Sequence, residues 1–237
     1  MDIKKYKADV NYTYTLGAFP TIELLRHKND KVIKVLIHST FSNVQVLKEI
    51  EELVDNKVIE YNDKLISKLS DKENVYVVGV FNKYDSHLDE NEDHLVLDNP
   101  SNMGNFGTIV RSSLGFNIKN IAVIRPGIDY FNPKAIRASM GAIFSVNIEY
   151  FDSLDDYYLR YKNHTMYTFM LQAKKSLREE LFSNKPVSLI FGNEATGLDH
   201  KYLDDNSLII KHNDLIDSLN ITNAVSIALY EYNEKCR

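Results

Sequence analysis

The chain has 237 residues, of which 44% are hydrophobic and 26% are charged, and its formal net charge is −5. This composition is typical of a globular protein with one large domain or two small ones, and no apolar run approaches the roughly 20 residues that span a bilayer. The lysine-bearing start lacks the apolar core of a signal peptide, and the single Cys236 excludes an intramolecular disulfide framework and a Cys-based metal site. We therefore expect a cytoplasmic protein without a membrane segment.

The acidity of the chain is concentrated in one place. Residues 85–93 contain five Asp and Glu residues and no Lys or Arg, so the net charge argues only weakly against a nucleic-acid partner. The run lacks periodicity, as a solvated linker does. We predict a small α/β domain over 1–84, an acidic linker over 85–94 and a second domain over 95–237.

The first half reads as a small α/β unit. Ser42 and Gln45 form a capping box that predicts a helix running to Val54. The apolar run 75–81 predicts a strand that is buried on both faces. We also expect helices at 20–27 and 65–69, and strands at 32–38 and 58–59.

The second half alternates strands and helices more regularly. Asn132 and Pro133 predict a capped helix start with a first-turn proline. The alternation predicts a mostly parallel sheet with helices on both faces. Strands are expected at 95–97, 121–124, 146–150, 166–171, 187–191 and 208–210, and helices at 107–114, 133–140, 154–161, 177–181 and 220–233.

Two strand-to-loop transitions carry the most functional information. The run 187–191 leads into a Gly-rich loop that holds Glu194, and the run 208–210 leads into a loop that ends at Ser218-Leu219-Asn220. Loops at the carboxyl ends of neighbouring parallel strands bind small molecules in open α/β sheets. The chain has no G-x-G-x-x-G, Walker or H-E-x-x-H motif.

Each of these residues also has a purely structural explanation. Ser218, Asn220 and Asn105 are residue types that cap helices, and Glu194 could be a solvated acid in a turn. Arg111 lies one to two turns into an otherwise apolar helix, where a surface arginine could extend its charge into water. Residues 105–111, the loop that holds Glu194, and the stretch that begins at Ser218 form three motifs, whose order and spacing together make coincidence a poor explanation.

With these motifs, residues 95–233 resemble the SpoU–TrmH branch of the SPOUT methyltransferases. The first motif resembles 105–111, the second 191–198 and the third 218–224, and a middle segment resembles 132–142. The first half is more loosely similar to the ribosomal-protein-like RNA-binding domain that precedes the catalytic domain in many members.

The resemblance implies an α/β fold whose C-terminal SPOUT domain has a mostly parallel sheet and a deep trefoil knot. It also implies a homodimer that uses S-adenosylmethionine, without a metal, to methylate a ribose 2′-hydroxyl of RNA, either tRNA or rRNA. The catalytic residues would be Arg111, Asn105, Glu194, Ser218 and Asn220. The cofactor would be bound by Leu171, Gln172, Ala173, Phe191, Gly192, Asn193, Gly197, Ile210, Lys211, Leu219, Asn220 and Ala224.

The roles follow from side-chain chemistry. Because a guanidinium keeps its proton, we expect Arg111 to hold a phosphate and stabilise oxyanion charge rather than act as a base. Ser218, Asn220 and Asn105 would orient the hydroxyl, Glu194 would order the second motif's loop, and the first motif of one subunit would complete its partner's site.

Two departures from the family pattern leave alternatives open. Ile210-Lys211-His212 replaces the usual Ile-Pro-Met, and Asn102 with Gly104 offers a competing register for the first motif, which Arg111 does not fit. An RNA-binding assembly factor that has lost methyl transfer is the second hypothesis. A nucleotide-dependent oxidoreductase is disfavoured by the missing dinucleotide fingerprint.

Overall fold

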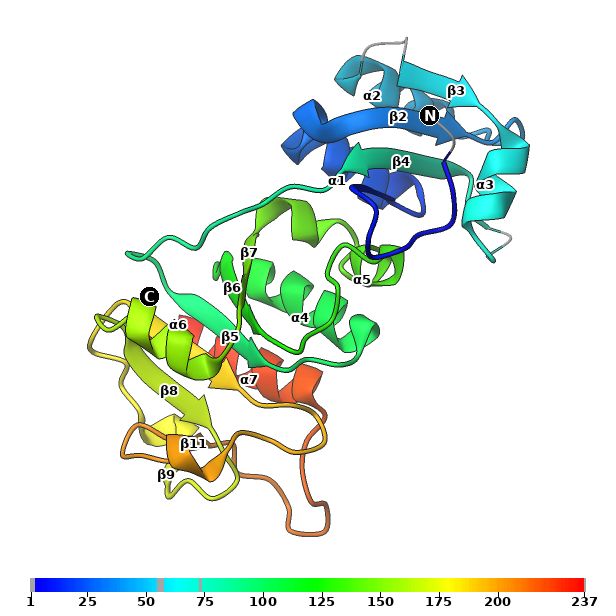
Figure 1. Cartoon of the computed structure of the whole chain (residues 1–237). Coiled ribbons are helices and arrows are strands. Elements are labelled where there is room, and N and C mark those ends of the chain that lie inside the picture. The colour runs from blue at the N-terminus through cyan, green and yellow to red at the C-terminus, as the bar shows by residue number, and fades with distance from the viewer. Residues whose placement is uncertain (1–2, 55–57, 73, 237) are drawn as a thin grey trace. The chain divides into compact units, whose positions relative to one another are not determined.

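The computed structural model describes residues 3–54, 58–72 and 74–236, and the chain forms two compact units (Figure 1). Unit 1 comprises Met1–Tyr84 and Asp129–Ser145, and unit 2 comprises Asp85–Ile128 and Val146–Arg237. The first boundary between the two units lies between Tyr84 and Asp85. Residues 129–145, expected to continue the second domain, pack instead with the first unit.

Unit 1 is a four-stranded mixed sheet with helices on both faces. Its sheet order is β1-β4-β2-β3, in which β2 and β3 are parallel and the other pairs antiparallel. Its elements are β1 (Tyr12–Tyr14), α1 (Ala18–His27), β2 (Val32–Ile37), α2 (Val44–Leu53), β3 (Ile59–Tyr61), α3 (Asp63–Leu69), β4 (Val77–Asn82) and α5 (Pro133–Ala138), with short 3₁₀ turns η1 (Asn29–Lys31) and η3 (Ala142–Ser145).

The alternation of side chains along β2 separates the two faces of this sheet. Val35 and Ile37 pack with Ile50 of α2 and with the buried side of α1. Leu36, between them, packs on the other face with Ile66 of α3. Helices α1 and α2 therefore cover one face of the sheet, and α3 covers the other.

The N-terminus of α2 corrects one sequence prediction. Asn43, not Ser42, caps the helix, because the Asn43 side chain accepts a hydrogen bond from the Val46 amide at 3.2 Å. Ser and Asn are both good N-cap residues, so the sequence alone offers two adjacent starts.

Unit 2 is built on a seven-stranded, all-parallel sheet of order β7-β6-β5-β10-β8-β11-β9. The prediction of a mostly parallel sheet is confirmed. Its elements are β5 (His94–Asp98), α4 (Met103–Gly115), β6 (Asn120–Ile124), β7 (Asn147–Phe151), α6 (Leu154–Arg160), β8 (Thr165–Phe169), β9 (Lys175–Ser176), η4 (Leu177–Glu179), β10 (Val187–Phe191), η5 (His200–Tyr202), β11 (Leu208–Ile209) and α7 (Ile221–Lys235).

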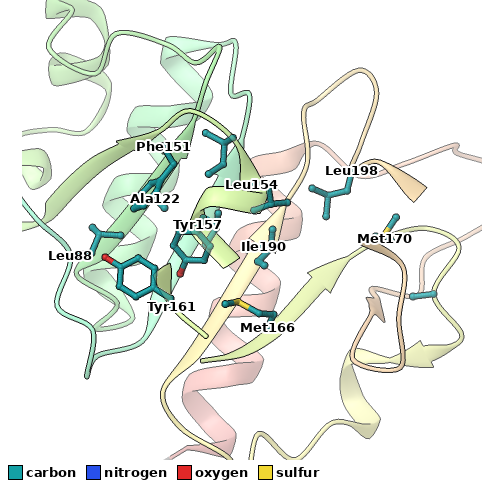
Figure 2. Close-up of a cluster of buried hydrophobic side chains, with 13 residues drawn as sticks. Leu88, Ala122, Phe151, Leu154, Tyr157, Tyr161, Met166, Met170, Ile190 and Leu198 are labelled. Carbon is teal, nitrogen blue, oxygen red and sulfur yellow. The ribbon is translucent and has the colours of Figure 1, made fainter. Parts of the chain in front are cut away.

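The core of unit 2 lies on both sides of this sheet. Val96 joins a cluster of buried side chains under α6 that includes Tyr157 and Ile190 (Figure 2). Leu95 and Leu97 point to the opposite face and are also fully buried. Burial on both faces explains why the strands read as continuous apolar runs.

The acidic segment 85–93 differs from the solvated linker that its charge predicts. Leu88 is only 6% exposed and belongs to the cluster in Figure 2. The Leu88 amide donates to Glu149 Oε2 at 3.0 Å, and the Asp89 carbonyl accepts from the buried His94 ring at 2.8 Å. The segment is thus fastened to the rest of unit 2 through Leu88 and the Asp89 backbone, while the side chains of His87 and residues 89–92 are exposed.

Within the described residues, no helix is both long and apolar enough to cross a membrane. The deep trefoil knot stays a prediction.

Candidate functional site

The carboxyl ends of three parallel strands meet at one edge of the unit 2 sheet. Phe169 at the end of β8 pairs with Phe191 at the end of β10, and Leu208 of β11 lies on the other side of β8. The two phenylalanine rings stack with their centroids 4.2 Å apart and their planes 7° from parallel. Since these strand ends lead into loops, they form the floor on which a ligand site can be built.

A cavity of ≈ 250 Å³ lies at this edge, as the sequence predicts. Its wall combines apolar side chains with the backbone of the Gly-rich loop. The lining residues are Phe169, Met170, Leu171, Gln172, Phe191, Gly192, Asn193, Glu194, Ala195, Thr196, Gly197, Leu198, Leu208, Ile209, Ile210, His212, Ser218, Leu219, Ile221 and Ala224.

The Gly-rich loop folds tightly back on itself. Asn193 and Gly197 form a β-bridge, with the Gly197 amide 2.9 Å from the Asn193 carbonyl. A Cβ added at Gly192 would lie 2.2 Å from the backbone carbon of Gly197, so only glycine fits there. Gly197 has a φ of +69°, which glycine adopts readily, and the space beside it is open.

The Asn193 side chain fixes this loop from inside. Its Oδ1 accepts from the Ala195 amide at 2.9 Å and the Thr196 amide at 3.3 Å, while its Nδ2 donates to the Asn99 carbonyl at 2.7 Å. The loop backbone is therefore held in one shape, which keeps its polar groups in place at the cavity wall.

Glu194 joins the Gly-rich loop to the start of α4. Its carboxylate accepts from the Ser101 hydroxyl at 2.9 Å, the Ser101 and Asn102 amides at 3.3 and 3.4 Å, and Asn105 Nδ2 at 3.4 Å. Burial pushes the pKa of Glu194 upward, but these hydrogen bonds and one from its own backbone outweigh burial and hold the pKa below its ordinary value. The Glu194 carboxylate thus holds the Gly-rich loop against the start of α4 and so links two of the predicted motifs.

The start of α4 corrects the expected start of this helix. The helix begins at Met103 rather than Gly107, and Asn102 is its N-cap, accepting from the Gly104 and Asn105 amides at 2.8 and 3.0 Å. Asn105 is therefore not the cap. It lies in the first turn, where its side chain reaches Glu194.

The loop after β11 closes another side of the cavity. Ile210, His212, Ser218 and Leu219 line it, and the His212 ring lies 2.9 Å from the Ile210 carbonyl. Asn220 does not line it. It caps α7 by accepting from the Thr222 amide at 2.9 Å, the structural role that its residue type favours.

The predicted cofactor residues divide accordingly. Ala173 is buried in the core cluster, and Lys211 is exposed, with its Nζ 3.7 Å from Glu179. Neither these two residues nor Asn220 line the cavity. The expected residues that do line it are Leu171, Gln172, Phe191, Gly192, Asn193, Gly197, Ile210, Leu219 and Ala224.

The structure brings only some of the predicted catalytic residues to the cavity. Glu194 and Ser218 line the cavity, and Asn105 touches Glu194. Arg111 does not line it: the residue is exposed, on a stripe of α4 that also presents Gly104, Thr108 and Gly115. In the described part of the chain, no carboxylate pairs with the Arg111 guanidinium.

Sequence reasoning missed several wall residues. Phe169, Met170 and Leu208 belong to strand ends that the sequence marks only as apolar, and Thr196 and Leu198 lie within the recognised loop. The others are Ala195, Ile209, His212 and Ile221. The order of strands in the sheet would have revealed Phe169, because β8 lies beside β10.

Comparisons with known proteins agree with this architecture. A model of the SpoU rRNA methylase family matches residues 92–230. A Geobacillus stearothermophilus relative with the provisional name tRNA (cytidine(34)-2′-O)-methyltransferase is 32% identical over 144 residues, which cover 58% of this chain and 91% of the relative.

Two solved structures extend the likeness to both units. The SpoU methyltransferase AviRb of Streptomyces viridochromogenes, in complex with AdoMet, superposes with a TM-score of 0.82 at 20% identity, covering 95% of this chain and 91% of its own. An AdoMet-bound rRNA methyltransferase of Sinorhizobium meliloti gives a TM-score of 0.78 at 25% identity, covering 94% and 87%.

Proposed function

The chain belongs to the SpoU rRNA methylase family, and from this membership and its strand-end cavity we propose that it is an S-adenosylmethionine-dependent RNA 2′-O-methyltransferase. The substrate class is a structured RNA, tRNA or rRNA, and the reaction takes place in the cytoplasm. The observation that carries the proposal is the cavity between β10 and α7, whose wall contains most of the residues expected to bind the cofactor.

The cavity suits this cofactor chemically. Leu171, Ile210 and Leu219 offer apolar surface for a flat heterocycle, while the backbone of 192–197 offers polar groups at close range because Gly192 and Gly197 carry no side chain. His212 in place of the family's methionine keeps its ring beside the Ile210 carbonyl, within the same wall.

When bound, S-adenosylmethionine supplies a methyl group on a sulfonium, whose neutral leaving group needs no metal. The protein must place the ribose hydroxyl and stabilise the negative charge that develops on its oxygen. Ser218 presents a hydroxyl at the cavity edge and can orient the incoming ribose. Arg111 can hold the adjacent phosphate in a bidentate contact that a lysine cannot make.

Arg111 does not line the cavity of its own subunit. We therefore propose that it acts at the cavity of a second copy of the chain. Next to α4, helix α7 exposes Ile227 and Tyr230, which are 43% and 54% exposed. The two helices are linked by the Ser112–Ser226 contact at 3.0 Å and by the Phe116–Tyr230 ring pair. This partly apolar face is suited to burial in a homodimer that brings Arg111 to the partner's cavity.

The role of unit 1 in this proposal is to bind the RNA substrate. The family model matches residues 92–230, so residues 1–84 of unit 1 lie outside the part of the chain that it matches. Such an α/β unit can supply contacts to parts of the RNA distant from the reacting nucleotide.

Incubation of the purified chain with radiolabelled S-adenosylmethionine and bulk tRNA or rRNA tests the proposal. We expect labelled methyl groups in the RNA. The phosphodiester bond next to each modified ribose should resist alkaline hydrolysis, because a methylated 2′-oxygen cannot attack the neighbouring phosphate. A chain that binds RNA but never transfers methyl would instead be the assembly factor.

A further inference from the structure

The two helical faces of unit 1 carry charges of opposite sign. On the α3 face, a hollow lies between β2, β3 and α3, and Lys34, Lys64 and Lys68 line it together with Glu60 and Asn62. Lys64 and Lys68 are exposed and one helical turn apart, so their ammonium groups lie on the same side of α3.

The carboxylate inside this hollow is already neutralised. Glu60 forms an ion pair with Lys34 and accepts from Asn62 Nδ2 at 2.7 Å. The hydrogen bond from Asn62, together with that from Lys34, holds the pKa of Glu60 below its ordinary value. Among the described residues, no carboxylate pairs with Lys64, so the hollow keeps an excess of positive charge.

The positive charge continues beyond the hollow. Asp71, just after α3, forms an ion pair with Lys5 at 2.7 Å, and Lys134 of α5 lies close enough to lower the pKa of Asp71 further. One acid is thus outnumbered by two lysines at the end of α3.

The α2 face has the opposite character. Glu51 and Glu52 are exposed there, and Lys48 lies 3.8 Å from Glu52. Glu49 is paired with Arg26 of α1 at 2.5 Å. A polyanion would be repelled by this face and attracted by the α3 face.

We propose that the lysine hollow on the α3 face is the site where unit 1 contacts the phosphodiester backbone of structured RNA. Lysines are flexible point charges that contact phosphates without reading base sequence, which suits a surface that positions the RNA while the cavity of unit 2 acts on it. The inference rests on the proposed function for the identity of the polyanion. The new element is the surface of unit 1, the lysine hollow, that binds this polyanion.

The test measures binding of fluorescently labelled bulk tRNA and fragmented rRNA to the full chain by anisotropy, over a range of salt concentrations. The variants are Lys64→Glu, the double variant Lys64→Glu with Lys68→Glu, and the matched control Lys48→Glu on the α2 face. Melting curves and calorimetry with S-adenosylmethionine establish that the variants are folded and that unit 2 is intact. Lys64→Glu is tested alone because the Lys68 Nζ also donates to the Ile3 carbonyl at 3.4 Å. Replacing Lys68 could therefore loosen the N-terminal segment, whereas replacing Lys64 does not remove this contact.

We expect Lys64→Glu to weaken RNA binding several-fold and the double variant to weaken it at least about tenfold. The slope of log Kd against log salt should fall by about one for each phosphate contact removed. Lys48→Glu should bind within twofold of the unchanged chain, and all variants should bind S-adenosylmethionine equally.

Equal RNA affinity and equal salt slope in the double variant would overturn this inference, even if methyl transfer is observed. RNA binding that depends on Lys64 and Lys68 without any methyl transfer would support the inference while refuting the proposed function. Loss of RNA binding in Lys48→Glu to the same extent would also overturn it, because the effect would then not depend on the face.

Discussion

Gly192 and Gly197 lie five residues apart in the same loop, yet the structure predicts different consequences for their substitution. An alanine Cβ at Gly192 would lie 2.2 Å from the Gly197 carbonyl carbon and 2.4 Å from the Leu198 nitrogen. Both neighbours are backbone atoms, so the loop itself would have to move. At Gly197, a Cβ would meet nothing within 4 Å, and only the φ of +69° opposes it.

These distances give the expected magnitudes. Carbon atoms pack at roughly 3.5–4.0 Å, so Gly192→Ala requires a displacement of more than about 1 Å, at a cost of about 1–3 kcal/mol for overpacking. Loss of the hydrogen bond between Gly197 and Asn193 adds about 1 kcal/mol. Gly197→Ala should cost only about 1–2 kcal/mol of backbone strain. For a protein of this size, each kcal/mol lowers the melting temperature by roughly 2–4 °C.

Melting curves and titration calorimetry with S-adenosylmethionine measure the difference. From a total cost of about 2–4 kcal/mol, we expect Gly192→Ala to melt roughly 4–16 °C lower and to lose cofactor binding together with loop structure. Gly197→Val should melt below Gly197→Ala, because a β-branched residue is strongly disfavoured at positive φ, and it should bind the cofactor poorly, since its side chain fills open space at the cavity wall. If Gly192→Ala melts within 2 °C of the unchanged chain and binds normally, the loop geometry described here is wrong. If Gly197→Val binds normally, the loop is not the cofactor wall.

Three further predictions follow from other parts of unit 2. Arg111→Ala should lower methyl transfer about a hundredfold to a thousandfold, with melting temperature and cofactor affinity nearly unchanged and poor rescue by Arg111→Lys; turnover above roughly a third of normal would remove Arg111 from the mechanism. Burial lowers the pKa of His94 from 6.5 to about 4, so its contribution to stability is present above pH 6.5 and is lost as the pH falls towards 4. Urea titrations of the unchanged chain should show a loss of about 3 kcal/mol over that range, and an equal loss in His94→Gln would refute the assignment. Ile227→Asp with Tyr230→Asp should convert a dimer into monomers in sedimentation runs, and mixing Arg111→Ala subunits with Gly197→Val subunits should restore partial activity; a monomer with full activity would exclude the shared site.

The sequence predicts the central strands well because strands that are buried on both faces appear in the sequence as continuous apolar runs. The expected strand 187–191 coincides with β10, and the expected strand 121–124 lies within β6. Two short strands leave no such pattern: the sequence does not predict β1 and β9, because β1 is defined by its pairing with β4 and β9 by its pairing with β11.

Helix starts depend on contacts from distant residues. Asn102 caps α4 and Asn105 does not, and the Asn102 amide is held by Glu194, about ninety residues away in the chain. Both asparagines are good caps locally, so only the tertiary contact decides between them. The position of residues 129–145 in unit 1 is likewise set by packing that no local pattern records.

Tertiary contacts also decide which residues line the candidate site. The Gly-rich loop was recognisable because Gly192 and Gly197 flank Glu194 directly after a buried strand. The family resemblance also assigns Ala173 and Lys211 to the cofactor wall. Ala173 instead faces the core and Lys211 faces solvent towards Glu179. Adjacent residues in an extended loop point in opposite directions, so proximity in sequence does not imply a shared wall.

The most direct test of the proposed activity is to map ribose methylation in RNA that has been incubated with the purified chain and labelled S-adenosylmethionine. The account predicts label in a 2′-O-methyl group at a defined nucleotide of tRNA or rRNA, and its near absence with Arg111→Ala. Absence of any labelled ribose, from a chain shown to bind both S-adenosylmethionine and RNA, would contradict it.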